Sequence, residues 1–526
     1  MTPTPVSSAS LPPDVVETAD AGTHLHTVAG GAAIAFSGSA VRTALSYLFN
    51  ILVARSIGAE AFGLFSIGLS IANVGDRVAL LGFDNTLLRY IAIYEGEQTW
   101  DRLRDTLRLA TRLVAVGGLV VGGALFLSAD WLARSAFHQP ELGFVLQVFA
   151  LALPFSALTT LWIFSIQSFK AMHYVAIVRD LLRPGFQIAL AGGLLAIGWG
   201  LRGVLAAYAA PTLLAAACAL YLLGRLARGR HVKRPEPDAP PRPVGVDRPA
   251  LIAFAVPMYM LSLTSAVTAR TGTVLLGALS VPGQAGVYFA AFRTVSLGLL
   301  ALEGFNAIFS PIIADLHNRG ERDQLAGLYQ VVTKWQLTLT LPLFVGMAIL
   351  ATRIMALFGH EFRAGGLALA ILCVAFGVHG AAGSVSPLLE MTGRPALNLV
   401  NVLLSFGLNV ALTVMLIPRF GIVGAALATG AAMIFLVLLR FVEVFWLIGF
   451  QPYTAAFGKP LLAAGLAGLT LATVDRFWSG PAGLLIGLLL LFATYAGLLL
   501  ILGLSSEDRQ VLRLARDRLA RNRTER

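Results

Sequence analysis

Six ionisable side chains stand inside long apolar runs of the sequence. They are Arg42, Asp76, Arg77, Arg270, Arg293 and Glu303. A charge near the middle of a bilayer costs at least ~2.5–3.5 kcal/mol on insertion scales, so each side chain is expected to face the protein interior or a wet cavity. A guanidinium binds phosphate oxygens bidentately and stays charged where the dielectric constant is low. Four arginines against two carboxylates therefore predict a net positive site that suits an anionic headgroup.

Two interpretations of this set stay open. In the first, the four arginines bind an anionic substrate, and Asp76 and Glu303 contact it or couple its movement to an ion. In the second, the carboxylates and arginines pair with one another and only hold helices together. For Asp76 and Glu303, the neutralisation of a neighbouring arginine is the simpler role.

Other polar residues in apolar runs are weaker candidates. Arg179, Asp180 and Arg183 occupy the first turns of a later run, where they either snorkel to the membrane interface or line a route by which a headgroup enters. His379 is either a proton carrier or, more simply, a hydrogen-bonded packing residue.

Two asparagines and one charged pair are expected to stabilise helix packing and to have no transport role. Asn401 and Asn409 are expected to hydrogen-bond between helices. Arg440 and Glu443 are three residues apart and are interpreted as a local ion pair.

The composition places these residues in a membrane protein. Of the 526 residues, 57% are hydrophobic and 13% are charged, and the mean hydropathy is +0.77. Too few polar side chains remain to cover a water-facing surface. Both cysteines, Cys218 and Cys373, lie in apolar runs, which excludes a disulfide framework or a cysteine-built metal site. We predict neither a metal nor a cofactor.

Apolar runs long enough to cross a bilayer repeat along the chain, each needing about 20 residues. They lie near 28–53, 62–83, 109–128, 143–165, 176–199, 203–223, 252–279, 285–312, 335–357, 365–388, 396–417, 421–446, 457–474 and 482–504. The sequence therefore predicts an all-α polytopic protein of about fourteen transmembrane helices. The run at 176–199 is the least certain because charged residues occupy its first turns.

The distribution of Lys and Arg predicts the orientation. Most of them fall in segments that share one side of the membrane with both termini, so both termini are expected in the cytoplasm. The net charge of +11 then reflects topology and attraction to anionic lipid, with no role for nucleic acid. The first 27 residues contain no Lys or Arg and no apolar core, so we do not expect them to act as a cleavable signal peptide.

These features divide the chain into six parts. We predict a disordered cytoplasmic tail at 1–27, an N-lobe of six spans at 28–223, a Pro/Arg-rich cytoplasmic linker at 224–249, a C-lobe of six spans at 250–446, two further spans at 447–504, and a basic amphipathic cytoplasmic tail at 505–526.

An internal repeat relates the two lobes. Gly63-Leu64-Phe65 matches Gly286-Val287-Tyr288, and Gly200-Leu-Arg-Gly203 matches Gly421-Ile-Val-Gly424 at nearly the same offset. Six spans per copy keep both copies in one orientation, which predicts a parallel repeat about an axis along the membrane normal. Two such bundles around a central cavity are typical of transporters.

Several segments carry a family resemblance. They are ARSIGAEAFGLFSIGLSI (54–71), LLGFDNTLLRYIA (80–92), PGQAGVYFAAFRTVS (282–296), FSPIIADLHNRGERDQLAGLYQVVTKW (309–335), LLEMTGRP (388–395) and IPRFGIVGAALATG (417–430). In composition and order they resemble the polysaccharide-biosynthesis flippases of the multidrug/oligosaccharidyl-lipid/polysaccharide superfamily, over residues 28–445. Many relatives carry an acidic residue in the seventh span where this chain has Arg270-Thr271-Gly272-Thr273, so a cation site there does not carry over.

The resemblance implies a V-shaped pair of lobes that alternates access and moves a polyprenyl-diphosphate-linked oligosaccharide to the outer leaflet. It implies a transporter, without enzymatic activity, in the bacterial cytoplasmic (inner) membrane. The expected partners are the lipid-linked sugar, membrane lipids and other polysaccharide-assembly proteins, with a monomeric transport unit.

Three other functions were compared with flipping. A cation-coupled multidrug exporter of the same superfamily would need cavity carboxylates, whereas this cavity is predicted to be net positive. A membrane-embedded glycosyltransferase or ligase would need a sizeable extramembrane loop, and the longest outside loop, 129–142, offers one His and a few charges. A nucleotide-driven pump is disfavoured because the sequence has no GxxxxGK[ST] motif.

Overall fold

The computed structural model describes most of the apolar part of the chain. The described residues are 17–229, 248–392, 394–447, 449, 453, 457–477 and 481–502. The interior of the predicted linker, the basic tail at 505–526 and residues 1–16 lie outside the described residues. Residues 17–27 differ from the prediction of a disordered tail, because they continue the helix that follows and no proline interrupts them.

The first half of the described chain consists of helices joined by short connections. It comprises α1 (Glu17–Leu80), α2 (Phe83–Gly96), α3 (Trp100–Trp131), a π-helical turn η1 (Leu132–Ala136), α4 (Glu141–Ser168), α5 (Met172–Val175), a π-helix η2 (Ala176–Leu182), α6 (Arg183–Ala196) and α7 (Gly200–Gly229). The predicted span at 176–199 is therefore helical, although its first turns are wider than an α-helix.

The second half is also helical. It comprises α8 (Arg248–Leu279), α9 (Pro282–Ser296), α10 (Leu299–Asn318), α11 (Arg322–Ile349), α12 (Ala351–Ala356), a 3₁₀ segment η3 (His360–Gly365), α13 (Gly366–Ala382), α14 (Val385–Met391), α15 (Pro395–Leu447), α16 (Gly458–Phe477) and α17 (Pro481–Ile501). The residues that the structure describes contain no strand.

Glycine kinks fold the two longest helices. The 64 residues of α1 would span about 96 Å if straight, which exceeds any bilayer. Gly58 (φ 79°) interrupts α1 and Gly421 (φ 53°) interrupts α15, and glycine adopts such positive φ values without a Cβ clash. Gly200, the repeat partner of Gly421, has nearly the same φ of 51°, which agrees with the internal repeat.

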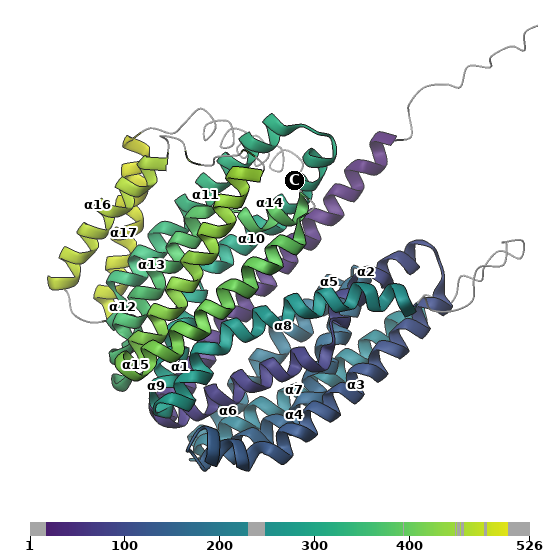
Figure 1. The fold of residues 1–526 in the computed structure, drawn as a ribbon, viewed down its shortest axis with the longest axis horizontal. Helices are drawn as coiled ribbons and strands as arrows, with labels where there is room; N and C mark the ends of the chain where they lie inside the picture. Colours follow the sequence, from purple (N-terminus) through teal and green to yellow (C-terminus); the bar gives the residue numbers. More distant parts are fainter. Residues whose placement is uncertain are drawn as a thin grey trace, which may run out of the picture.

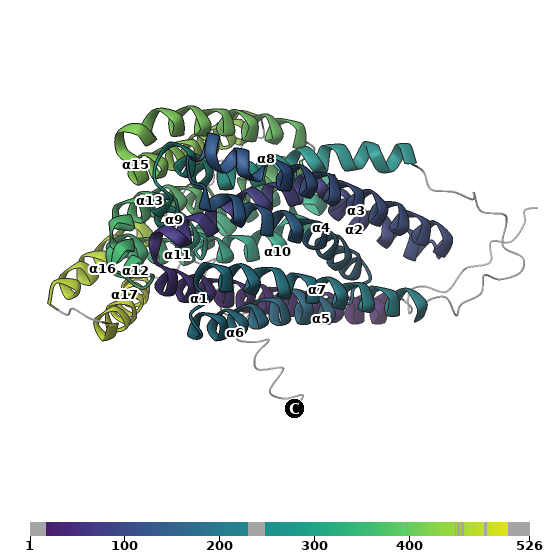
Figure 2. The ribbon, with the colours of Figure 1, turned by 90° about the horizontal axis from the view of Figure 1, so that it is seen from below.

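The helices form two groups that diverge from a common end (Figures 1 and 2). One group contains α2 to α7 and the other α9 to α15, while α16 and α17 pack on each other and against α11. Helices α1 and α8 lie between the groups and contact each other. We call the end where α7 stops and α8 starts the linker side, and the end with Gly58 and Gly421 the kink side.

The two groups are packed together near the kink side. A Cβ on Gly63 of α1 would lie 1.9 Å from the carbonyl oxygen of Pro282, so only glycine allows α1 and α9 to approach this closely. Next to this crossing, the Phe62 ring lies 5.9 Å from the Phe289 ring and 5.7 Å from the Phe362 ring. Aromatic packing and a small-residue crossing thus join the groups at one end.

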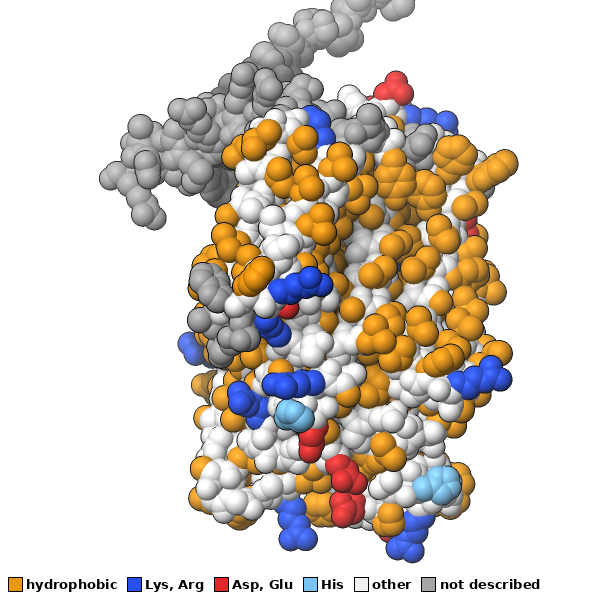
Figure 3. Space-filling view, turned by 90° about the vertical axis from the view of Figure 1, so that its left-hand side faces the viewer, with side chains coloured by type: hydrophobic (Ala, Val, Ile, Leu, Met, Phe, Trp, Pro, Cys, Tyr) orange, Lys and Arg blue, Asp and Glu red, His pale blue; other side chains and the backbone are white. Residues whose placement is uncertain are grey.

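The surface suits a lipid environment. Eight of the described helices are long and apolar enough to cross a membrane, and the long α1 and α15 each count once among them. Large hydrophobic side chains such as Leu127, Leu489 and Trp446 are more than two-thirds exposed. Figure 3 shows a face dominated by hydrophobic side chains, with the charged ones mainly in its lower half. These observations confirm an all-α multi-pass membrane fold, and the count of fourteen crossings stays a prediction.

Candidate substrate-binding cavity

A cavity of about 410 Å³ opens beside the first half of α1. Its wall comes from α1, α4, η2, α6 and α7, with one residue from α9. Five arginines and one carboxylate line it: Arg42, Arg77, Arg179, Arg183, Arg293 and Asp76. Uncharged polar and aromatic side chains complete the wall, among them Asn50, Asn73, Thr159, Gln187, Phe164 and Tyr208.

Helical periodicity positions the α1 residues of this wall. Arg42, Ser46 and Asn50 follow one another at intervals of four, so they share one face of the first half of α1. Asn73 and Arg77 share a face of the second half in the same way. The kink at Gly58 turns the second half back along the first, so that both faces line one cavity.

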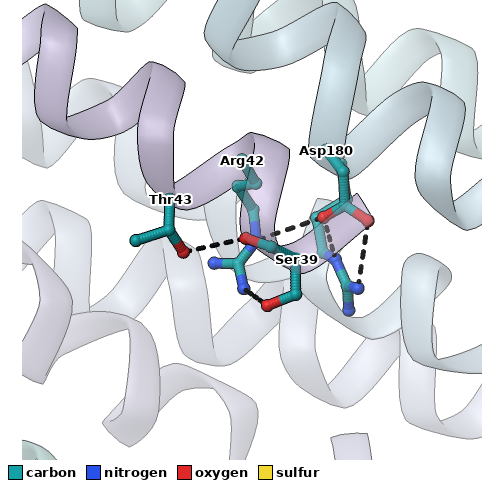
Figure 4. A network of polar contacts seen from close by, with 5 residues as sticks. Ser39, Arg42, Thr43 and Asp180 are labelled. Carbon is teal, nitrogen blue, oxygen red and sulfur yellow. Dashed lines mark hydrogen bonds and ion pairs between the residues drawn. The ribbon is translucent and has the colours of Figure 1, made fainter. Parts of the chain in front are cut away.

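Arg42 lies beside a buried carboxylate (Figure 4). Its Nε is 3.1 Å from Oδ1 of Asp180, and its Nη2 donates a hydrogen bond of 3.0 Å to the Ser39 hydroxyl. Arg179 binds the same carboxylate through two hydrogen bonds, from Nε (2.8 Å) and Nη2 (3.3 Å). Asp180 is therefore shared by two arginines of the cavity wall.

Arg77 also has a carboxylate partner. Its Nη1 donates a hydrogen bond of 2.9 Å to Oδ2 of Asp84, which is buried in the first turn of α2. Leu81 and Gly82 adopt positive φ values of 51° and 77° between α1 and α2. This break starts a new helix, whose N-terminal dipole favours the Asp84 carboxylate.

Asp76 accepts a hydrogen bond from a neutral side chain and makes no direct ion pair among the described residues. Its Oδ2 accepts a hydrogen bond of 2.7 Å from Ser156 of α4, and its buried Oδ1 has no hydrogen-bond partner among the described residues. Arg77 makes its direct ion pair with Asp84, while Asp76 interacts electrostatically with Arg183 and Arg77. Whether Asp76 neutralises these arginines or contacts the substrate stays a prediction.

Arg183 and Arg293 hold no carboxylate in the described part of the chain. Arg183 donates a hydrogen bond of 3.3 Å to Thr212 and lies 5.8 Å above the Tyr208 ring. Arg293 lies 5.2 Å above the Phe289 ring, and its buried Nε has no hydrogen-bond partner among the described residues. These guanidiniums keep donor capacity for an anion in the cavity.

The remaining predicted residues lie outside this wall. Arg270 of α8 is absent from the lining but lies near enough to Arg77 and Arg293 for their charges to repel one another. Glu303 of α10 is exposed and electrostatically coupled to Arg42. Neither residue makes an ion pair within 4.0 Å among the residues that the structure describes.

Sequence reasoning missed contacts of several residues in this cavity. Arg179 and Arg183 line the wall, which is compatible with a headgroup route, and their role stays a prediction. Asp84 is not among the predicted site residues, and helical spacing does not indicate its contact with Arg77, because the break at Leu81 and Gly82 separates their helices. The contact of Asp180 with Arg42 joins segments far apart in the chain, and no sequence signal indicated it.

The second half of the molecule holds a separate polar cluster. Asn401 donates a 2.5 Å hydrogen bond to Glu443, and Asn409 donates one of 3.4 Å to Thr429, each across the kink of α15. Arg440 donates from Nε to Asn398 (2.8 Å), and its interaction with Glu443 is electrostatic, without an ion pair within 4.0 Å among the described residues.

His379 and the acidic residues give no sign of a metal site. The Nδ1 of His379 is buried without a hydrogen-bond partner among the described residues. Within the same part of the chain, no group of three or more His, Cys, Asp or Glu side chains could hold a metal ion.

Known proteins with related sequences or folds include glycan flippases. The probable low-salt glycan biosynthesis flippase Agl15 of Haloferax volcanii is 28% identical over 159 residues, which cover 30% of this chain and 33% of that relative. The chain thus spans about a third of the length of this curated relative.

Solved structures show the same fold at low sequence identity. The lipid II flippase MurJ in an inward closed conformation has a TM-score of 0.66 at 14% identity, covering 88% of this chain and 97% of MurJ. An inward-facing multidrug resistance MATE family transporter also has a TM-score of 0.66 at 14% identity, covering 78% and 94% of the two chains.

A family model gives the assignment. The model described as polysaccharide biosynthesis protein matches residues 28–317, which is more than half of the chain and contains the whole cavity wall. The chain belongs to the polysaccharide biosynthesis protein family.

Proposed function

We propose that the protein flips a polyprenyl-diphosphate-linked oligosaccharide from the cytoplasmic to the outer leaflet, for surface polysaccharide biosynthesis. It acts as a transporter and catalyses no covalent reaction. The observation that carries the proposal is the cavity wall of five arginines and one aspartate within a membrane-spanning member of this family. Positive charge is costly at membrane depth, and an anionic ligand in the cavity would compensate it.

The diphosphate is the part of the cargo that fits these arginines. Guanidiniums bind phosphate oxygens through paired hydrogen bonds and keep their charge in a low-dielectric cavity. Arg293 and Arg183 have free donor capacity there, Arg42 and Arg77 share theirs with carboxylates, and Arg270 adds positive potential from beside the wall.

The sugar is proposed to contact the uncharged part of the wall. Asn50, Asn73, Thr159 and Gln187 supply amide and hydroxyl groups, and Phe164 supplies an aromatic ring. A sugar offers hydroxyl groups to such polar side chains and an apolar ring face to an aromatic side chain. The polyprenyl chain stays in the bilayer.

Transport is proposed to occur by rocking of the two lobes, 28–223 and 250–446. The close crossing of α1 and α9 at Gly63 supports a pivot or closed gate on the kink side. The linker side is proposed to face the cytoplasm, together with both termini. The proposed location is the bacterial cytoplasmic membrane, with a monomeric transport unit and other polysaccharide-assembly proteins as partners.

A cation-coupled multidrug exporter is the second candidate, because the fold is shared with the MATE family transporter. An organic cation would need acidic or neutral surroundings, and five arginines repel it. The cavity charge therefore favours the diphosphate cargo.

A deletion strain separates the two candidates. Mass spectrometry of its lipid extract, with a membrane-impermeant sugar probe for sidedness, is expected to show a polyprenyl-diphosphate oligosaccharide accumulating on the cytoplasmic side. No accumulation, combined with new sensitivity to organic cations, would support the exporter.

A further inference from the structure

Asp180 contacts two arginines of the cavity wall, Arg42 and Arg179, and is itself absent from the lining. Figure 4 shows its contact with Arg42. Only 1% of its side chain is exposed, whereas Arg42 exposes 40% and Arg179 exposes 30%. The carboxylate is absent from the cavity lining, and both guanidiniums are part of that lining. An anion in the cavity would therefore approach these arginines from the side opposite Asp180.

The two arginines hold this carboxylate unequally. Arg179 makes two aligned hydrogen bonds to it, one to each oxygen. Arg42 contributes a single contact, from Nε to Oδ1 at 3.1 Å, and its Nη2 donates to the Ser39 hydroxyl instead of to the second carboxylate oxygen. Arg42 can therefore turn toward the cavity while Asp180 keeps Arg179, which avoids the large cost of an unpaired buried carboxylate.

Local structure brings Asp180 to Arg42. Asp180 stands on the π-helix η2, and π-helical turns occur frequently at functional sites. On α1, a Cβ at Gly38 would lie 2.6 Å from Oδ2 of Asp180. The absence of a side chain at Gly38 therefore lets the carboxylate approach α1 one turn before Arg42.

The other arginines of the wall have no comparable arrangement. Arg77 makes a full hydrogen bond of 2.9 Å to Asp84, and Arg293 has no carboxylate partner among the described residues. Arg179 holds Asp180 through two hydrogen bonds, and Arg183 interacts electrostatically with Asp76, which itself lines the cavity. Arg42 is thus the wall arginine that makes a single contact with a carboxylate behind the lining.

We propose that the Asp180 carboxylate competes with the phosphate of the cargo for Arg42, and so lowers the affinity of this arginine for the phosphate. The inference rests on the proposed function and adds a residue that sets affinity. A carrier must bind its cargo firmly enough to load it and weakly enough to release it. Asp180 supplies the second condition, because Arg42 returns to it when the phosphate leaves.

Binding of inorganic pyrophosphate to the purified full-length protein tests this role. Asp180→Asn removes the charge at nearly constant volume and is expected to tighten pyrophosphate binding about tenfold, the effect of one charge-assisted hydrogen bond. The gain should vanish in an Arg42→Gln background. Asp105→Asn is the matched control, because Asp105 is 57% exposed and pairs at 3.7 Å with Arg108 outside the cavity.

A second variant keeps the charge and moves it. Gly38→Ala places a methyl group against Oδ2 of Asp180 and should push this carboxylate away from Arg42, so pyrophosphate binding should again tighten. This variant tests the inference even if Asp180→Asn does not fold. Unchanged or weaker binding in the folded variants overturns the inference.

The proposed function fails separately. If wild type binds pyrophosphate, Arg293→Ala loses it and Asp180→Asn changes nothing, only the role of Asp180 is wrong. If neither wild type nor Asp180→Asn binds pyrophosphate, the anion site is refuted, and the inference with it.

Discussion

Substitution of Arg293 should change ligand affinity without changing the stability of the protein. Its guanidinium belongs to the cavity wall, its Nε is buried without a hydrogen-bond partner among the described residues, and it makes a cation–π contact with the Phe289 ring at 5.2 Å. A hydrogen bond to a charged group contributes about 1.5–3 kcal/mol. Arg293→Ala should therefore weaken binding of a diphosphate about 10- to 100-fold.

The same substitution should leave thermal stability intact. An unpaired buried charge costs free energy in the folded state, so its removal offsets the loss of side-chain packing. The assay is pyrophosphate binding by calorimetry, together with the melting temperature of the purified protein. Wild-type pyrophosphate affinity in Arg293→Ala would refute the assignment of this guanidinium to anion binding.

Three further outcomes follow from the contacts. Arg77→Gln leaves the Asp84 carboxylate buried and unpaired, so unfolding free energy should fall by about 3–5 kcal/mol, and Asp84→Asn in the same chain should restore most of the melting temperature. Arg42→Lys keeps the charge and loses the planar fork, so polysaccharide output in a complementation assay should fall only in part. Gly63→Ala forces α1 away from Pro282, so folded yield by size-exclusion chromatography should drop sharply, with Gly96→Ala, which meets no neighbour, as the control.

The sequence predicted much of the fold, because bilayer crossing and helical periodicity are local properties. Each predicted span overlaps a described helix, and the repeat glycines Gly200 and Gly421 share a positive φ. Residues 17–27 were expected to be part of a disordered tail, but they are helical, because no proline between residue 17 and the apolar run ends α1.

The cavity was predicted in part. Arg42, Arg77, Arg293 and Asp76 line it, as their depth in apolar runs indicated, although the roles of these residues stay a proposal. Partner choice could not be predicted, since the pairing of Arg42 with Asp180 depends on how α1 packs against η2.

The π-helix explains another part of the difference. It widens the turns at 176–182, where Arg179 lines the cavity and Asp180 lies behind it. Such a widening leaves no mark in hydrophobic periodicity.

Translocation in proteoliposomes tests the central claim most directly. The purified protein is reconstituted with a labelled polyprenyl-diphosphate oligosaccharide, and a membrane-impermeant sugar probe reports which leaflet holds it. The account predicts protein-dependent movement of the lipid-linked sugar by wild type and its loss in Arg293→Ala. Absence of movement by wild type, or equal movement by Arg293→Ala, would contradict an arginine cavity that carries the diphosphate.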